Sequence, residues 1–276
     1  MGRIRVWNTL RKINQDRPPK GELVIEDAFL RQAGVSREAL LEELQADLIT
    51  LPVNYQSKID WRYWRRQDYF TFALIEGPFS TMITALGWQR ASAWIVHDPD
   101  LSRKFMAGYL QNLCDWADHA LDDGCEGLIL ADDLADQRGL LLAPEYLQTY
   151  YFPELQAWLH KYQIVKTPVM FHSDGNITDI MADLKQVGFW GVQGLQPDAG
   201  MNKKDFMSGL LQKWAFWGNF QFEGPLGLKA ARQVQNEAAR LCEEWQPTSA
   251  YIFGSCSGLY AGLPLNLVRA AYRAVK

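Results

Sequence analysis

Short apolar runs alternate with longer amphipathic patterns along most of the chain. Eight runs have the length of a β-strand, and they lie at residues 21–25, 47–53, 69–75, 127–131, 169–174, 190–195, 215–217 and 250–253. Between several of them, apolar side chains recur at helical spacing, as in residues 36–48, 98–124, 144–160 and 226–245. This alternation predicts an α/β protein with a single-domain (β/α)8 TIM barrel, whose usual size of about 250 residues is close to the 276 found here.

The first 20 residues differ in composition from the rest. They carry six basic side chains and one acidic one and end in Pro18-Pro19 and Lys20. We therefore expect a short helical N-terminal extension over residues 1–20 and the barrel over residues 21–276. A doubly wound sheet is the alternative architecture, but no G-x-G-x-x-G motif follows the first predicted strand.

The run at 169–174 ends in side chains that commonly bind ligands. His172 and Asp174 are two residues apart, so on a strand both side chains point to the same face. A lone pair of this kind is most often a hydrogen-bonded structural pair. At the carboxyl end of a barrel strand, however, both side chains can reach one ion or one substrate group.

The carboxyl ends of all strands of a TIM barrel meet at one mouth. Ten polar or ligand-type side chains follow the predicted strands and would surround that mouth: Glu26, Glu76, Asp132, Asp133, His172, Asp174, Gln196, Asp198, Asn219 and Cys256. We take Asp133 and Gln196 as candidate catalytic residues. The candidate substrate-binding residues are Glu26, Glu76, Asp132, Asp198 and Asn219.

Three of these side chains form a candidate metal site. His172, Asp174 and Cys256 offer one nitrogen, one oxygen and one sulfur ligand, a set that suits zinc with its fourth position open. An open position is what a catalytic zinc needs, because a substrate or leaving group must coordinate there. Cys256 alone would equally fit a small buried position in the core.

The charge of the chain narrows the classes of partner. The formal net charge is −4 and the isoelectric point about 5.6, so no overall field draws the chain to nucleic acid or to an anionic membrane. No apolar run approaches the roughly 18 residues that would cross a bilayer. We expect a cytoplasmic protein whose ligand is a small molecule.

Several short motifs follow one another between residues 70 and 276. They are Glu76-Gly77-Pro78-Phe79-Ser80 with Leu86-Gly87, Ala131-Asp132-Asp133 followed by Arg138-Gly139 and Ala143-Pro144-Glu145, His172-Ser173-Asp174-Gly175-Asn176, Gln196-Pro197-Asp198-Ala199-Gly200-Met201, Trp217-Gly218-Asn219, and Gly262-Leu263-Pro264 with Asn266. In this order they resemble the uroporphyrinogen decarboxylase-like superfamily, especially its corrinoid-dependent methyltransferase branch. The N-terminal quarter of the chain is less diagnostic.

The resemblance implies a (β/α)8 barrel with the site at its mouth. Methyltransferases of this branch hold zinc with a His-x-Cys pair after strand five and a Cys after strand eight. They pass a methyl group to or from the cobalamin of a separate corrinoid protein. The implied cofactors are therefore zinc and a cobalamin supplied by a partner, and the implied substrate is a small methyl donor or acceptor.

The chain matches this pattern only in part. His172 and Cys256 fit it, whereas Asp174 stands where the first Cys would be and Gln196 stands where Glu is common. A second thiolate suits enzymes that activate a thiol, while an oxygen ligand leaves zinc a harder Lewis acid, better matched to an ether or phenolate oxygen. The resemblance thus favours the branch of methoxyaromatic O-demethylases over thiol-activating methylcobamide methyltransferases.

Two other functions stay open at this point. Arg31-Gln32-Ala33-Gly34 resembles part of the arginine-rich motif of true uroporphyrinogen decarboxylases, but Val35 replaces its second arginine. A metal-free decarboxylase is therefore the chief enzymatic alternative. A barrel that has lost catalysis and only binds a tetrapyrrole or a partner protein is the third, because replacing a zinc-binding Cys by Asp is a change that such a protein would show.

Overall fold

Seven parallel strands form one sheet in a computed structural model of the chain, in which all residues are described except 55, 202–213, 223–229, 246–247 and 249. In sheet order the strands are β1 (Leu48–Pro52), β2 (Phe70–Glu76), β3 (Gly127–Ala131), β6 (Val169–Ser173), β7 (Gly191–Gly194), β8 (Ala215–Phe220) and β9 (Tyr251–Ser255). Two short strands, β4 (Ala135–Asp136) and β5 (Gly139–Leu140), form a separate antiparallel hairpin.

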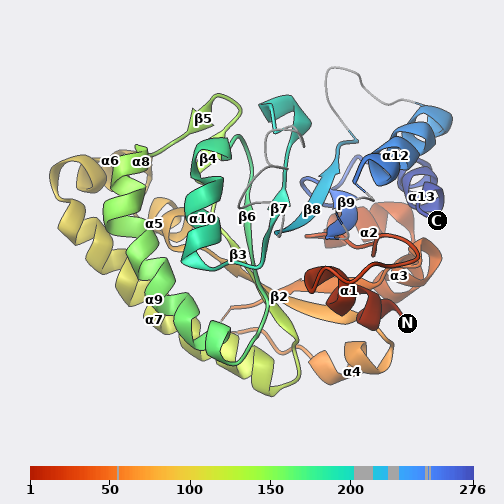
Figure 1. The fold of residues 1–276 in the computed structure, drawn as a ribbon, viewed down its shortest axis with the longest axis horizontal. Helices are drawn as coiled ribbons and strands as arrows, with labels where there is room; N and C mark the ends of the chain where they lie inside the picture. Colours follow the sequence, from red (N-terminus) through yellow and green to blue (C-terminus); the bar gives the residue numbers. More distant parts are fainter. Residues whose placement is uncertain (55, 202–213, 223–229, 246–247, 249) are drawn as a thin grey trace.

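Three helices precede β1, and further helices follow most of the later strands. They are α1 (Gly2–Leu10), α2 (Asp27–Ala33), α3 (Arg37–Leu44), α4 (Trp61–Arg66), α5 (Pro78–Leu86), α6 (Trp88–His97), α7 (Pro99–Asp122), α8 (Pro144–Tyr146), a π-helical turn (Leu147–Tyr151), α9 (Phe152–Ile164), a 3₁₀ turn (Thr178–Ile180), α10 (Met181–Val187), a 3₁₀ turn (Pro197–Ala199), α12 (Ala231–Trp245) and α13 (Leu265–Ala274). Figure 1 shows α7 and α9 on one flank and α12 and α13 on the other. Within the described residues, no helix is both long and apolar enough to cross a membrane.

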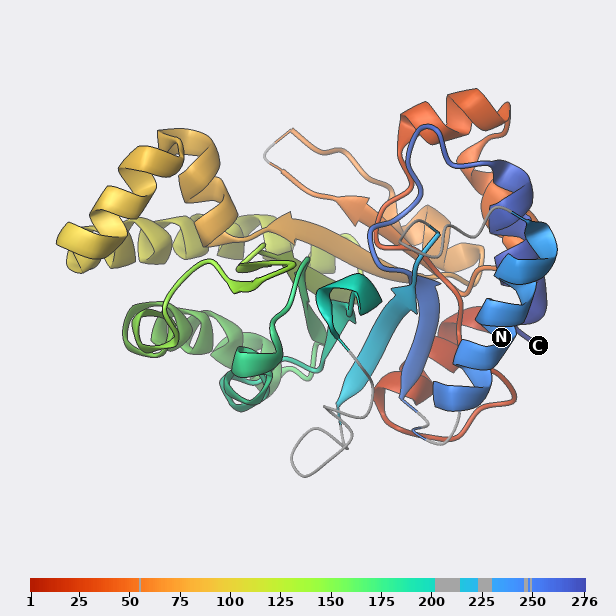
Figure 2. The same ribbon diagram turned by 90° about the horizontal axis from the view of Figure 1, so that it is seen from above.

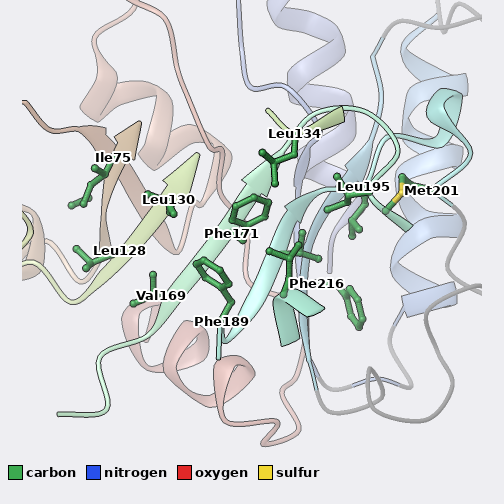
Figure 3. Packing of buried hydrophobic residues seen from close by; sticks show 14 of the residues in the cluster. Ile75, Leu128, Leu130, Leu134, Val169, Phe171, Phe189, Leu195, Met201 and Phe216 are labelled. Carbon is green, nitrogen blue, oxygen red and sulfur yellow. The ribbon is translucent and has the colours of Figure 1, made fainter. Parts of the chain in front are cut away.

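The sheet is curled, and both of its faces are buried. In β3, Leu128 and Leu130 belong to the larger hydrophobic cluster, while Ile129 between them belongs to a second, smaller cluster. Alternate side chains of a strand point to opposite faces, so the two clusters are the outer and the inner layer of packing. Figure 3 shows part of the outer layer, and in Figure 2 β2 runs at a large angle to β8 and β9, as curling requires.

The strand expected at residues 21–25 is absent, so the prediction of an eight-stranded barrel is wrong in this part. Residues 19–25, which we call the closing segment, make only isolated bridges, between Lys20 and Phe253 and between Ile25 and Leu259. The described chain thus forms a curled seven-stranded half-barrel of the TIM type rather than a closed ring of eight strands.

The closing segment nevertheless contacts both edges of the sheet. On the β9 side, the Phe253 N–H donates to Pro19 O (2.8 Å) and the Gly21 N–H donates to Phe253 O (3.0 Å). On the β1 side, the Asp47 N–H donates to Lys20 O (2.7 Å). Residues 19–21 therefore join β9 to β1 although they form no strand.

Side-chain carboxylates explain why this join is irregular. The Lys20 N–H donates to Asp47 Oδ2 (2.8 Å), and the Ser255 N–H donates to Glu22 Oε2 (3.0 Å). These donors would bond backbone carbonyls in a regular ladder. Pro18 and Pro19 have no N–H group and cannot donate a ladder bond. The carboxylates of Asp47 and Glu22 thus accept hydrogen bonds that backbone carbonyls would accept in a regular strand.

The expected N-terminal helix is present as α1 and covers the amino end of the curled sheet. Its Val6 and Leu10 are buried in the inner cluster with strand side chains. Arg5 and Arg17 bind the carboxylate of the buried Asp47, at 2.5 and 2.6 Å. The basic residues noted in the sequence thus serve partly to neutralise a buried acid at the closing segment.

Several sequence boundaries need adjustment. The predicted strand at 215–217 continues to Phe220, which places Asn219 inside β8. The first residues of the helix expected at 226–245 lie outside the described residues, and α12 is described from Ala231 onward. The β4–β5 hairpin has no counterpart in the predicted pattern, because two-residue strands carry no usable periodicity.

We predict that Glu22 makes the stability of the fold depend on pH. Burial raises the pKa of Glu22 to about 7, against the effect of its hydrogen bonds from Ser255 and Tyr272. The folded protein therefore binds a proton that the unfolded chain releases near pH 4.5, and the free energy of unfolding should fall by on the order of 3 kcal/mol as pH rises through this interval. Urea unfolding of the wild type and of Glu22→Gln between pH 4.5 and 8 measures this fall.

The Glu22→Gln variant should start less stable at low pH and lose less stability as pH rises. Asp132, whose pKa burial raises to about 6, contributes in the same direction and keeps some slope in both proteins. Identical slopes in wild type and variant would show that Glu22 is ionised in the folded state throughout.

Candidate functional site

The carboxyl ends of β3 and β6 are adjacent and bring acidic residues to a histidine. Ala131 of β3 lies in register with His172 of β6, so Asp133, two residues after β3, comes close to the end of β6. Asp133, His172 and Asp174 each offer one ligand atom, and these atoms all lie within 4.8 Å of one another. We call these three residues the mouth cluster.

Direct contacts hold the mouth cluster together. The Asp174 N–H donates to Asp133 Oδ1 (2.9 Å), and the same oxygen lies 3.8 Å from His172 Nε2. The latter distance is too long for a hydrogen bond. His172 and Asp174 are largely shielded, whereas the Asp133 side chain is 56% exposed.

Two polar atoms of the mouth cluster are buried without a hydrogen-bond partner among the described residues. They are His172 Nδ1 and Asp174 Oδ1. Burial raises the pKa of Asp174, the nearby His172 lowers it, and the negative charge of Asp133 raises it further. Because buried polar groups are normally satisfied, these atoms mark a place where a cation or a ligand would lower the free energy.

Cys256 does not belong to the mouth cluster, although the sequence groups it with His172 and Asp174. The thiol is buried at the end of β9, 2% exposed. Burial raises its pKa, and the charge of Asp174 raises it further, so the two residues are electrostatic neighbours. Among the described residues, Asp133 and not Cys256 has a candidate ligand atom within 4.8 Å of those of both His172 and Asp174.

Asp132 faces the protein interior. It is fully buried, and it accepts hydrogen bonds from the N–H groups of Phe79 (3.0 Å) and Ser80 (2.6 Å) at the start of α5 and from the hydroxyl of Tyr151 (2.6 Å). A side chain at Gly77 would lie 2.2 Å from Asp132. This placement gives Asp132 the task of fixing α5 beside the mouth, one residue from Asp133.

Gln196 connects three of the loops at the mouth. Its Oε1 accepts from the Gly175 N–H (2.9 Å), just beyond β6, and its Nε2 donates to Ser257 Oγ (3.3 Å), just beyond β9. Asn219 has a positive φ of 66° and donates to Leu195 O (2.7 Å). Both amides hold loop backbone or side chains near the mouth, and their roles in catalysis and substrate binding stay predictions.

The remaining predicted residues are solvent-exposed and stand outside the mouth cluster. Glu26 precedes α2 and accepts from the Ala261 N–H (3.2 Å), Asp198 accepts from Gln221 Nε2 (2.8 Å), and Glu76 ends β2. A role in substrate binding stays a prediction for all three.

Gln193 is a polar residue of the interior that the sequence analysis did not single out. It is fully buried in the middle of β7, and its Nε2 donates to Ser255 O (3.0 Å) and Cys256 O (3.2 Å). The signal was present in the sequence, because a glutamine between Val192 and Gly194 interrupts a short apolar strand.

Comparisons with known proteins agree with this architecture. The family model of uroporphyrinogen decarboxylase (URO-D) matches residues 66–276. A methyltransferase from Methanosarcina mazei has a TM-score of 0.77 and 15% sequence identity, with 99% of this chain and 97% of that chain covered. The GH18 chitinase ChiB of Flavobacterium johnsoniae has a TM-score of 0.54 and 10% identity, with 94% of each chain covered. No curated protein matches the chain.

Solved structures at such low identity establish a common fold and nothing about the reaction. The family match is stronger evidence of relationship than these structural similarities, because it spans about three quarters of the chain and includes β2, β3, β6 and every later strand. It also begins close to residue 70, where the motifs quoted above begin. The chain belongs to the uroporphyrinogen decarboxylase family.

Proposed function

We propose that the chain is a zinc-dependent methyltransferase that moves a methyl group between a small substrate and the cobalamin of a separate corrinoid protein. The observation that carries the proposal is the mouth cluster, which gathers one imidazole and two carboxylates where a TIM-type enzyme has its active site. The family match and the fold shared with a methyltransferase support it.

The residues of the mouth cluster suit a zinc ion. Ligand atoms about 2 Å from a tetrahedral zinc lie roughly 3.3 Å apart, and the observed 3.8 Å between His172 Nε2 and Asp133 Oδ1 needs only a small contraction. The unpartnered oxygen of Asp174 offers a second carboxylate ligand. A three-ligand set of this kind leaves the fourth position open for a substrate.

The chemistry of the ligands favours a substrate that loses its methyl group from oxygen. Zinc bound there would supply Lewis acidity to the leaving oxygen, and it would be a harder acid with two carboxylates than with two thiolates. A methoxyaromatic ether, which leaves as a phenolate, fits this set. Asp133 reaches solvent and can meet an entering substrate. Gln196 is held through its oxygen by the Gly175 N–H, while its nitrogen makes a long 3.3 Å hydrogen bond to Ser257 and can donate its other proton to a substrate oxygen.

Decarboxylation is the second candidate function, because the family model is that of a decarboxylase. It is weaker for this chain since Arg31 lies on α2 without the second arginine that the family motif would place at position 35. Binding without catalysis is the third candidate, and the assay described below separates all three.

We predict that zinc binds through the mouth cluster and not through Cys256. The purified wild type should hold about one zinc per chain, as a ligand set of this size binds one ion. His172→Ala and Asp174→Ala should lose it, and Asp133→Asn should bind it more than 100-fold more weakly, beyond the roughly 10–100-fold seen when only an outer partner is removed. Asp136→Asn, which changes a half-buried acid on the neighbouring hairpin that pairs with Arg138, is the matched control and should bind normally.

Replacing zinc by cobalt would reveal a metal bound through Cys256, because a cobalt–thiolate bond has a characteristic absorption. Cys256→Ser should leave the zinc affinity unchanged, and Co²⁺ in the wild type should show no thiolate charge-transfer absorption. A thiolate band that disappears in Cys256→Ser would assign the metal to His172, Asp174 and Cys256 instead. Failure of the wild type to bind zinc even after reconstitution would remove the metal from the proposal.

We predict that the zinc-loaded protein methylates a reduced corrinoid protein with a methoxylated aromatic acid as donor. The change in cobalt absorption from Co(I) to methyl-Co(III) measures the reaction, and Asp133→Asn should reduce kcat while Asp136→Asn should not. Release of carbon dioxide from uroporphyrinogen without cobalt methylation would identify a decarboxylase. Tight binding with neither reaction would identify a binding protein.

A further inference from the structure

A pocket of about 420 Å³ lies between the start of the closing segment, α3 and α13. The two helices pack against each other near the C-terminal end of the chain (Figure 1). The charged side chains on its wall are one acid, Glu43, and five bases, Arg17, Lys20, Arg269, Arg273 and Lys276. We call this the basic pocket. Because the whole chain has a net charge of −4, this concentration of positive charge is a local feature.

Lys20 forms the buried back of the basic pocket. It is 2% exposed, and its Nζ donates to Tyr272 O at 3.4 Å, its one hydrogen bond to the described residues. An ammonium group has three donors, so two of them have no acceptor in the described chain. Burial and the charge of Arg17 lower the pKa of Lys20 to about 8. An anion beside Nζ would therefore stabilise a charge that the fold holds at a cost.

The carboxylates near the basic pocket are too few to balance its arginines. Arg269 Nε donates to Glu43 Oε1 (2.6 Å), and this hydrogen bond and the charge of Arg273 both lower the pKa of Glu43. Arg17 likewise shares the carboxylate of Asp47 with a second arginine. Each carboxylate thus serves two guanidinium groups. Together with the buried lysine, they leave an excess of positive charge around the pocket.

We propose that the basic pocket binds a small molecule through a dianionic phosphate group. A phosphate monoester carries a charge of about −1.5 to −2 at pH 7, so it matches this excess better than a single carboxylate does. Its terminal oxygens are strong acceptors for the ammonium of Lys20 at the back and for the guanidinium of Arg273, which is exposed at the rim. The volume lies within the roughly 300–1,000 Å³ of small-molecule sites and leaves room for an organic part.

The basic pocket is a site separate from the mouth cluster. Asp47, which holds Arg17, immediately precedes β1, so the pocket lies near the amino end of this strand, whereas the mouth is formed by the carboxyl ends. The alternative role of Lys20 is structural: Tyr272 belongs to the last turn of α13, whose carbonyl end a cation stabilises. A lysine with this role alone gives the protein no affinity for phosphate, so a binding experiment separates the two.

Isothermal titration calorimetry of the full chain with inorganic phosphate, at pH 7 and constant ionic strength, tests the proposal. We expect one site per chain. Lys20→Met should bind phosphate about tenfold more weakly, as expected for the loss of a charge-assisted hydrogen bond. Arg273→Gln should bind it roughly threefold more weakly, because an exposed ion pair contributes less. Arg232→Gln, which removes an exposed arginine of α12 outside the pocket, is the matched control and should bind like the wild type.

Glycerol phosphate and acetate serve as further probes. Tighter binding of glycerol phosphate than of inorganic phosphate supports the proposal and assigns the pocket to an organic phosphate monoester. Equal binding of the two supports a site for the phosphate group alone. Because Arg273 is exposed, its variant keeps the test valid even where Lys20→Met does not fold.

Several results would overturn the proposal. They are a wild type that binds no phosphate, acetate that binds as tightly as phosphate, and a loss of affinity in Arg232→Gln equal to that in Arg273→Gln. Unchanged affinity in both Lys20→Met and Arg273→Gln would place any bound phosphate elsewhere on the molecule. None of these outcomes depends on zinc, so they leave the proposed function to its own tests.

Discussion

The join between β9 and β1 is the constraint on which the rest of the structure depends. Within the described residues the sheet has seven strands. Two buried carboxylates help the closing segment join its two edges: Asp47, which accepts from the Lys20 N–H, and Glu22, which accepts from the Ser255 N–H. Isolated buried carboxylates are costly. Here Arg5 and Arg17 neutralise Asp47, whereas Glu22 relies on hydrogen bonds and on a raised pKa.

This join has direct consequences for the mouth of the half-barrel. Ser255, held by Glu22, immediately precedes Cys256, and the carbonyls of both residues accept from Gln193 of β7. Gln193 in turn lies in register with His172 of β6. Buried polar contacts therefore run from the closing segment through β9 to β7, the strand that pairs with the one carrying His172.

The sequence predicts the elements that have a clear apolar periodicity. The prediction fails where side-chain carboxylates accept the hydrogen bonds that backbone carbonyls accept in a regular sheet. Each of the seven sheet strands was expected near its observed position, because alternating strand and helix patterns carry strong signals. Residues 21–25 have an equally apolar pattern, yet they form no strand, because the hydrogen bonds at this edge go to Asp47 and Glu22. A pattern of apolar residues contains no information about such partners.

The same limit applies to the candidate site. His172 and Asp174 were grouped correctly because two residues on one strand share a face whatever the rest of the fold does. Asp132 and Asp133 looked equivalent in the sequence, but the first fixes α5 and the second joins the mouth cluster. The register between β3 and β6, which pairs Ala131 with His172, brings Asp133 and not Asp132 to the histidine. Gln193 was missed because its partners lie on β9, more than 60 residues away in the chain.

The replacement of a thiolate by Asp174 offers a physical reason for the proposed metal ligands. The charge of Asp174 and the burial of Cys256 both raise the pKa of the thiol, and only a thiolate binds zinc well. Asp133, by contrast, is half-exposed and keeps contact with water on one side, so its charge costs less. A carboxylate at position 174 thus disfavours an ionised Cys256 in the metal-free protein, and Asp133 is the proposed third ligand because its oxygen lies within 4.8 Å of the ligand atoms of His172 and Asp174.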